Sequence, residues 1–205
     1  MKTTRLILRD GWQLSGPLSA HIGARLDRST DYGTFVNPRV GLDWIAGQYT
    51  NVFLLYGESA FPPSEIQQTS NGLFSPLGSD DLDPAKIRLL ELAIDHDFRN
   101  GVSLASNLFA YEQEDEIGVL PDPTAPIGTR FDNLDEEESG HGAEVLLGWQ
   151  ATPRVHISVG GAFQRTRSDD LGNTGAPELL PYAEVDVGPT RRWTINRRGH
   201  RRLGA

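Results

Sequence analysis

The sequence predicts an all-β protein: a segment of an antiparallel up-and-down transmembrane β-barrel, with about ten strands, short periplasmic turns and long extracellular loops. Three observations lead to this fold class. Apolar and polar residues alternate along most of the chain, the alternating segments are about ten residues long, and the connections are alternately short and long. A soluble strand averages about five or six residues, whereas a tilted strand that crosses a membrane needs about 9–11.

The strands follow from the alternation, taken in chain order. In residues 18–26 every second side chain from Leu18 to Leu26 is apolar, while His21 and Arg25 lie on the other face. Residues 154–166 repeat the pattern, with Val155 and Phe163 opposed to His156. Strands are expected near residues 4–14, 18–28, 37–46, 50–58, 87–98, 101–114, 140–150, 154–167, 178–187 and 192–197.

The connections alternate in length. The short ones are SGP, AGQY, RNG, ATP and GPTR; the long ones are RSTDYGTFV, residues 58–86, residues 115–139 and SDDLGNTGAP. Hairpins closed tightly at one end and loosely at the other are typical of outer-membrane barrels. A soluble sandwich or lipocalin-like barrel has no reason to keep this rhythm over ten strands.

Residues 82–98, LDPAKIRLLELAIDHDF, fit both a helix and a strand. Asp83 and Pro84 resemble a helix start, but Leu90, Leu92 and Ile94 also share one face of a strand. Because residues 87–98 lie between a long loop and a tight turn, where the next membrane crossing is due, we interpret them as a strand and Asp83–Pro84 as the end of the loop.

The composition excludes several classes of protein. At 205 residues the chain is long enough for one sizeable core. A mean hydropathy of −0.39 and the lack of an apolar run of about 20 residues exclude a helical membrane protein. The absence of cysteine excludes disulfides and thiolate metal sites.

The charge is uneven along the chain. Residues 191–202 hold six arginines and no acid, so residues 1–190 carry 13 basic against 28 acidic side chains, a net charge of −15. Nucleic acid is therefore not an expected partner. We divide the chain into a barrel segment, residues 1–190, and a basic tail, residues 191–205. The tail has arginines on both faces of its strand pattern, which a shifted reading frame or an early stop explains better than an arm that binds anionic partners.

No catalytic residue, cofactor site or metal site is expected. GESAF at 57–61 lacks the second glycine of a nucleophile elbow, and the five histidines are not spaced as metal ligands. The string SDDLDP lacks the glycine and the closing glutamate of a calcium loop. The acidic runs in 114–116 and 135–138 are interpreted as solvated loop charge, which in a complete barrel would favour cationic or neutral ligands at the mouth.

Four tryptophans, Trp12, Trp44, Trp149 and Trp193, lie near strand ends next to tight turns. In a membrane barrel they would belong to an aromatic girdle at the interface. In a soluble protein they would be core residues.

Two motifs resemble the barrel of TonB-dependent outer-membrane receptors. The first is the family's YG-x-x-F-x-x-PS segment, and the second is its L-x-P-E-K-x-x-x-x-E-L-G segment. Ala85 and Ala93 depart from the second, at the positions of its first Glu and its Gly. The residues that match are Tyr56, Gly57, Pro63 and Ser64, then Leu82, Pro84, Lys86, Glu91 and Leu92, while Phe61 lies one position after the Phe of the first motif.

The resemblance implies a non-enzymatic 22-stranded barrel with a plugged lumen, which takes up a ferric siderophore, cobalamin or a similar nutrient. Its implied partners are outer-membrane lipid, a plug domain, the TonB complex and a small ligand such as a metal chelate. We expect a fragment of such a receptor, located in the Gram-negative outer membrane as part of a longer precursor, because the first residues do not form a signal peptide. The alternatives are a soluble β-rich binding module and a passive outer-membrane barrel.

Overall fold

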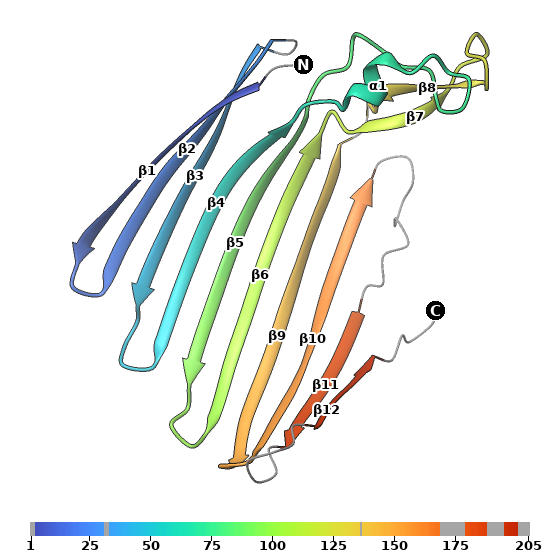
Figure 1. Cartoon of the computed structure of the whole chain (residues 1–205). Helices are drawn as coiled ribbons and strands as arrows, with labels where there is room; N and C mark the ends of the chain where they lie inside the picture. The colour runs from blue at the N-terminus through green and yellow to red at the C-terminus, as the bar shows by residue number, and fades with distance from the viewer. Residues whose placement is uncertain (1–2, 31–32, 136, 169–178, 188–194, 201–205) are drawn as a thin grey trace.

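Ten long strands form one antiparallel sheet in the computed structural model, which describes residues 3–30, 33–135, 137–168, 179–187 and 195–200. Each strand pairs with the next strand of the chain, except that β6 pairs with β9 (Figure 1). The strands are β1 (Thr3–Ser15), β2 (Leu18–Ser29), β3 (Gly33–Ile45), β4 (Thr50–Phe61), β5 (Ala85–Asp97), β6 (Val102–Glu114), β9 (Glu138–Thr152), β10 (Val155–Ser168), β11 (Leu179–Val187) and β12 (Ile195–His200).

The smaller elements lie in two of the connections. The helix α1 (Glu65–Thr69) follows β4, and the hairpin of β7 (Ile117–Pro121) and β8 (Thr129–Asn133) follows β6. Figure 1 shows all three beside one end of the sheet, opposite the tight turns. Within the described residues, no helix has the length and apolar character needed to cross a membrane.

The fold class is confirmed, and so are the first nine strands to within a few residues at their ends; of the strand expected at 192–197 the structure describes only the part from Ile195, in β12. The segment expected as a strand at 87–98 is β5 and not a helix, because β5 pairs along its whole length with β4 and β6. The connection RSTDYGTFV was wrongly expected to be a long loop: β2 continues to Ser29, β3 begins at Gly33, and these two residues pair. The connection SDDLGNTGAP and most of the basic tail lie outside the described residues.

The two faces of the sheet differ in chemistry because the register of the strands places the apolar residues of neighbouring strands on the same face. On the apolar face, Leu54, Leu92 and Leu108 lie in one cross-strand row. The apolar residues of β6 on this face run from Val102 to Ala110, eight residue steps or about 27 Å at about 3.4 Å per residue. This length is comparable to the apolar band of outer-membrane barrels, about 25 Å tall.

A belt of paired charges ends the apolar band on the side of the long loops. Glu58, Arg88 and Glu112 share a cross-strand row. Arg88 also forms a two-pronged ion pair with Glu114, with its Nη1 2.6 Å from Oε1. The change from leucines to paired charges marks the level at which a lipid-facing surface would meet water.

The described residues form no sizeable hydrophobic core. Among the described residues, Leu55, Leu82 and Ala125 are the only buried hydrophobic residues apart from prolines and glycines, while Leu8, Leu90 and many other large apolar side chains are half exposed. Long strands with one uncovered apolar face are typical of a sheet that faces lipid on that side.

Candidate functional site

A polar face lies opposite the apolar face, and a hollow of about 760 Å³ opens on it over β1 to β5. Most of its lining side chains belong to the polar parity of these strands, among them Arg9, Arg39 and Glu91. The volume is in the range of small-molecule sites, about 300–1,000 Å³.

Three arginines surround a glycine in this hollow. Arg9, Gly23 and Arg39 form one cross-strand row, with Gly23 in the middle. Since neighbouring strands lie about 4.8 Å apart, the backbones that carry Arg9 and Arg39 are about 10 Å apart. Arg25, two residues after Gly23 on β2, completes the triangle. The row continues to Gly57 on β4, so glycines flank Arg39 on both sides.

A buried carboxylate stands at the loop end of this cluster. Asp27 is 7% exposed and accepts hydrogen bonds from Arg5 Nε at 2.7 Å and from Arg25 Nε at 2.6 Å. Asn37 donates to the same carboxylate from Nδ2 at 3.2 Å, and its Oδ1 accepts from the backbone N–H of Ala60. The pairing of β3 with β4 ends at Arg39 and Gly57, so Asn37 satisfies a backbone donor where the strands separate.

A second hollow, of about 410 Å³, lies near the tight turns and has a different character. Asp95, Asp97 and His156 are among its lining residues. Among the described residues no group of three histidine, cysteine or carboxylate side chains is placed to hold a metal ion. His21 pairs instead with Asp43, Nε2 to Oδ2 at 2.7 Å, and His96 shares a hydrogen bond of 2.7 Å with Thr50.

The two long loops on the other side fold together into what we call the loop subdomain, residues 62–84 with 115–135. The backbone of Leu77 joins the edge of β8, with hydrogen bonds of 2.9 Å to Thr129 and Phe131. The side chain of Asn133 donates to the carbonyls of Asp83 and Asp115 and accepts from the N–H of Asp83. Segments about 50 residues apart in sequence therefore hold one another in place.

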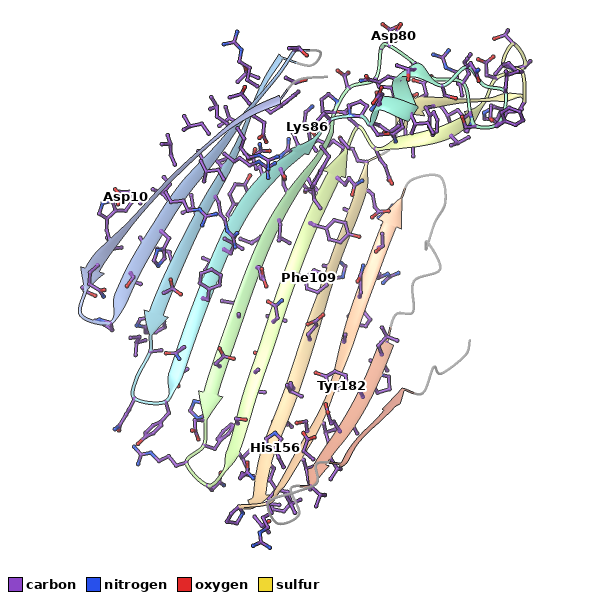
Figure 2. All side chains as sticks on the ribbon, in the orientation of Figure 1. Asp10, Asp80, Lys86, Phe109, His156 and Tyr182 are labelled. Carbon is purple, nitrogen blue, oxygen red and sulfur yellow. The ribbon has the colours of Figure 1, made fainter. Side chains whose placement is uncertain are left out.

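This subdomain has its own small core and a negative surface. Pro63, Leu82 and Ala125 are buried in it. In the turn between β7 and β8, the hydroxyl and the backbone N–H of Thr124 donate to Asp122, which lowers the pKa of that carboxyl. Its acidic residues include Asp80, which Figure 2 shows at the outer edge of the subdomain, and Glu137 follows it toward β9. Glu136 lies outside the described residues.

The two resemblance motifs come together in space. Tyr56 and Gly57 lie on β4, opposite Leu90 and Leu89 of β5, so the two motifs form one hairpin. Pro63 and Leu82, one from each motif, are both buried at the base of the loop subdomain. Glu91 lines the larger hollow. The motifs thus encode the junction between the sheet and its loop subdomain.

Aromatic rings on the polar face lie over glycines of the neighbouring strands. A Cβ atom added at Gly140 or Gly142 would collide with the ring of Tyr111 or Phe109, respectively. Tyr182 lies over Gly160 in the same way, and Figure 2 shows Phe109 and Tyr182 across the face of the sheet. Glycine allows these rings to lie flat, which leaves room on the polar face.

Three of the four tryptophans stand on the apolar face near the tight turns. Trp12 pairs with Ala20, Trp44 with Leu18 and Trp149 with Ile157, and each is about half exposed, at 48–49%. Trp193 lies outside the described residues. The three positions are those that an interfacial girdle would use.

The family can now be stated. The family model "TonB dependent receptor-like, beta-barrel" matches residues 2–199, nearly the whole chain. The chain therefore belongs to the TonB-dependent receptor β-barrel family, whose members are non-enzymatic transport proteins of the Gram-negative outer membrane. A search of curated proteins finds no matching sequence.

Solved structures share the fold at low identity. The siderophore receptor PirA of Acinetobacter baumannii superposes with a TM-score of 0.77 at 16% identity, over 95% of this chain and 32% of PirA. The FrpB iron transporter of Neisseria meningitidis gives 0.71 at 15%, over 92% and 30%. The ferric-catecholate import receptor Fiu of E. coli K12 gives 0.71 at 15%, over 95% and 33%. The chain thus spans about a third of the length of these receptors.

The arginine triangle and the loop subdomain were not expected from the sequence. The residues of the triangle lie on three strands, and only the register brings them together. The start of α1 could have been recognised in the sequence, because Ser64 and Gln67 have the spacing of a capping box. In the structure the Gln67 side chain accepts a hydrogen bond from the Ser64 N–H at 2.7 Å.

Proposed function

We propose that this chain is part of the barrel wall of an outer-membrane receptor that takes up a ferric siderophore, cobalamin or a similar nutrient. Outer-membrane lipid would contact the apolar face. A plug domain and the TonB complex would act through the full-length parent protein, and a small ligand such as a metal chelate would pass along the polar face. Residues 1–190 would form the barrel segment and residues 191–205 a basic tail, of which β12 continues the sheet.

The observation that carries this proposal is the pairing of a bare apolar band with a polar, hollowed face on the same sheet. Lipid on one side and a water-filled or plugged lumen on the other require this arrangement. The family match gives the class of transporter, and the solved receptors above are named for siderophores or iron.

Two other functions compete with this one. A soluble β-rich binding module would need to bury its apolar residues, and the described strands bury hardly any. A passive barrel or surface protein without energy coupling would share the strand array, so the sheet by itself does not separate it from a receptor.

Sequencing the DNA on both sides of the reading frame tests the proposal. We expect a plug and a signal peptide upstream, and further strands downstream of codon 196 in the same or another frame. A missing plug next to an intact barrel would favour the passive barrel. Clean stops and promoter-like sequence on both sides would contradict the receptor proposal and leave a self-contained β-protein.

A further inference from the structure

We propose that Arg165 and Arg167, on the apolar face of β10 at its loop end, bind the phosphate groups of an anionic lipid in the leaflet on the loop side. The inference rests on the proposed function only in placing the apolar face against outer-membrane lipid. It goes beyond that function because it assigns a headgroup site of stated charge to two residues on the face turned away from the ligand path.

The first step is the face on which the two arginines lie. Arg165 pairs with His141 of β9, and His141 pairs with Ala110 of β6, the last residue of the apolar band on that strand. Cross-strand partners project from the same face of a sheet, so Arg165 lies on the apolar face. Arg167, two residues further along β10, shares this face, and the two Cα atoms are about 7 Å apart. Neither arginine lines either of the two hollows.

The second step is the level of the pair along the strand. Phe163, two residues before Arg165, is apolar and half exposed on the same face. Arg167 pairs with Ser139, which pairs with Glu112 of the charged belt. The two arginines therefore lie where the apolar band ends on the side of the long loops. An anionic lipid whose acyl chains cover the band places its phosphate groups at this level.

The third step is the charge of the site. Arg165 and Arg167 are both exposed, and neither guanidinium group forms an ion pair or a hydrogen bond with the described residues. Their partners on β9, His141 and Ser139, carry no negative charge. Arg88 differs, because it lies in the same cross-strand row as Arg167 but already pairs with a carboxylate of β6. An anion can therefore bind the two arginines of β10 without displacing an existing partner.

The fourth step is the chemistry of the occupant. Guanidinium groups bind phosphate oxygens in a two-pronged geometry and are more weakly hydrated than ammonium groups, which suits a site at the edge of lipid. The exposed apolar residues of β10 adjoin the two arginines, so the surface matches a molecule with an apolar part and an anionic part. A free anion would contact only the arginines and leave the apolar residues uncovered. We therefore assign the site to a lipid.

Lipid binding to the purified, detergent-solubilised full-length receptor tests the inference. The probes are diphosphoryl lipid A, monophosphoryl lipid A and phosphatidylcholine, whose headgroup has no net charge. Native mass spectrometry measures the bound lipid as its concentration rises, and the wild type should bind diphosphoryl lipid A most tightly and phosphatidylcholine least. R165Q/R167Q should weaken the binding of diphosphoryl lipid A about tenfold and leave that of phosphatidylcholine unchanged. R165K/R167K should give an intermediate loss because it keeps the charge and loses the two-pronged contact.

The control is Arg154→Gln, which changes an exposed arginine in the tight turn at the other end of β10 and should alter none of the affinities. The abundance of the receptor in outer membranes shows whether each variant assembles. If R165Q/R167Q does not assemble, Ser139→Glu provides the second variant. It keeps both arginines, places a carboxylate in the cross-strand row of Arg167 and should also weaken the binding of diphosphoryl lipid A.

The outcomes separate the lipid site from the proposed function. A wild-type receptor that is absent from the outer membrane would contradict the proposed function. Equal affinity of the wild type for diphosphoryl lipid A and phosphatidylcholine would overturn the lipid site alone, because the arginines would then be neutralised by acids such as Asp169 and Asp170, which lie outside the described residues. Unchanged binding in R165Q/R167Q would overturn it as well. Displacement of diphosphoryl lipid A by inorganic phosphate would also overturn it, because the site would then take free anions.

Discussion

Asn37 joins three strands on the polar face, near its loop end. Its amide group bonds to the carboxylate of Asp27 and to the backbone of Ala60 at the point where β3 and β4 separate. It is 6% exposed, so water does not easily replace these bonds. One short side chain therefore satisfies a backbone donor and orients the carboxylate between two arginines.

We expect Asn37→Ala to lower the free energy of unfolding of the receptor by about 1–2 kcal/mol, because it leaves the Ala60 N–H without its partner and removes one of the two hydrogen bonds that Asp27 Oδ2 accepts. Urea unfolding in detergent micelles measures the change. Asn51→Ala is the matched control, since Asn51 is exposed on the same face, and it should cost less than about 0.5 kcal/mol. Equal effects of the two substitutions would contradict this role of Asn37.

The contact between Gly140 and Tyr111 gives a second prediction at this scale. A methyl group at Gly140 would displace the Tyr111 ring and break its hydrogen bonds to Glu138 at 2.9 Å and Thr166 at 3.1 Å. Gly140→Ala should destabilise the receptor by about 1–3 kcal/mol.

Tyr111→Ala provides the internal test of that prediction. Once the ring is gone, Gly140→Ala has nothing to collide with, so the double variant should be more stable than the sum of the two single effects implies. The same unfolding experiment measures all three variants. Strictly additive effects would mean that the ring and the glycine do not interact.

At the scale of single elements, the strands were predictable from the sequence and the loops were not. Each strand can be recognised from its own residues, because the alternation of apolar and polar side chains is a local pattern. Lipid on one side and the lumen on the other impose it along every crossing. The loop subdomain depends on contacts such as Leu77 with β8 and Asn133 with Asp83, which join residues about 50 positions apart. The arginine triangle depends on register in the same way, and no local pattern records it.

The two-faced character of β5 makes a prediction for one element. Leu92 lies in the middle of the apolar band, and its chain neighbour Ala93 lies on the polar face opposite Phe53 and Asn107. Leu92→Arg should destabilise the receptor by about 2–4 kcal/mol and reduce its amount in the outer membrane, because it places a charge in lipid.

Ala93→Arg is the matched control, with the same new side chain one residue away. It faces the lumen side and should be tolerated better, by at least about 1 kcal/mol. Unfolding in lipid vesicles and the abundance of the receptor in outer membranes both measure the difference. A larger loss for Ala93→Arg would mean that the faces are assigned the wrong way round.

At the scale of the whole molecule, the acidic loop subdomain and the arginine triangle act over different distances. Loop carboxylates exert a long-range field that salt screens beyond about 8 Å at physiological ionic strength. Arg9, Arg25 and Arg39 lie on the wall of the larger hollow, where a side chain acts on a ligand mainly at short range. The loops would therefore affect the association rate, while the wall would affect the affinity.

The loop charge can be tested with Glu136→Gln together with Glu137→Gln. Because the acidic mouth should attract cations, uptake of ferrioxamine B at low salt should become slower in this variant, and added salt should remove the difference. Initial uptake rates at two ionic strengths measure the effect. Unchanged uptake of every cationic ligand at low salt would rule out steering by these residues.

The described sheet also predicts how the chain behaves without further strands. β1 and β12 each pair with a single neighbour in the described residues, so both leave a row of backbone groups without strand partners. Such groups cost several kcal/mol each in lipid, and the bare apolar face is not covered in water. The 205-residue chain expressed by itself should therefore aggregate or be degraded. Sedimentation and pulse-chase degradation measure this, with the detergent-solubilised chain as the control. A sharp, reversible unfolding transition in detergent-free buffer would contradict the prediction, because it requires a core that covers the apolar face.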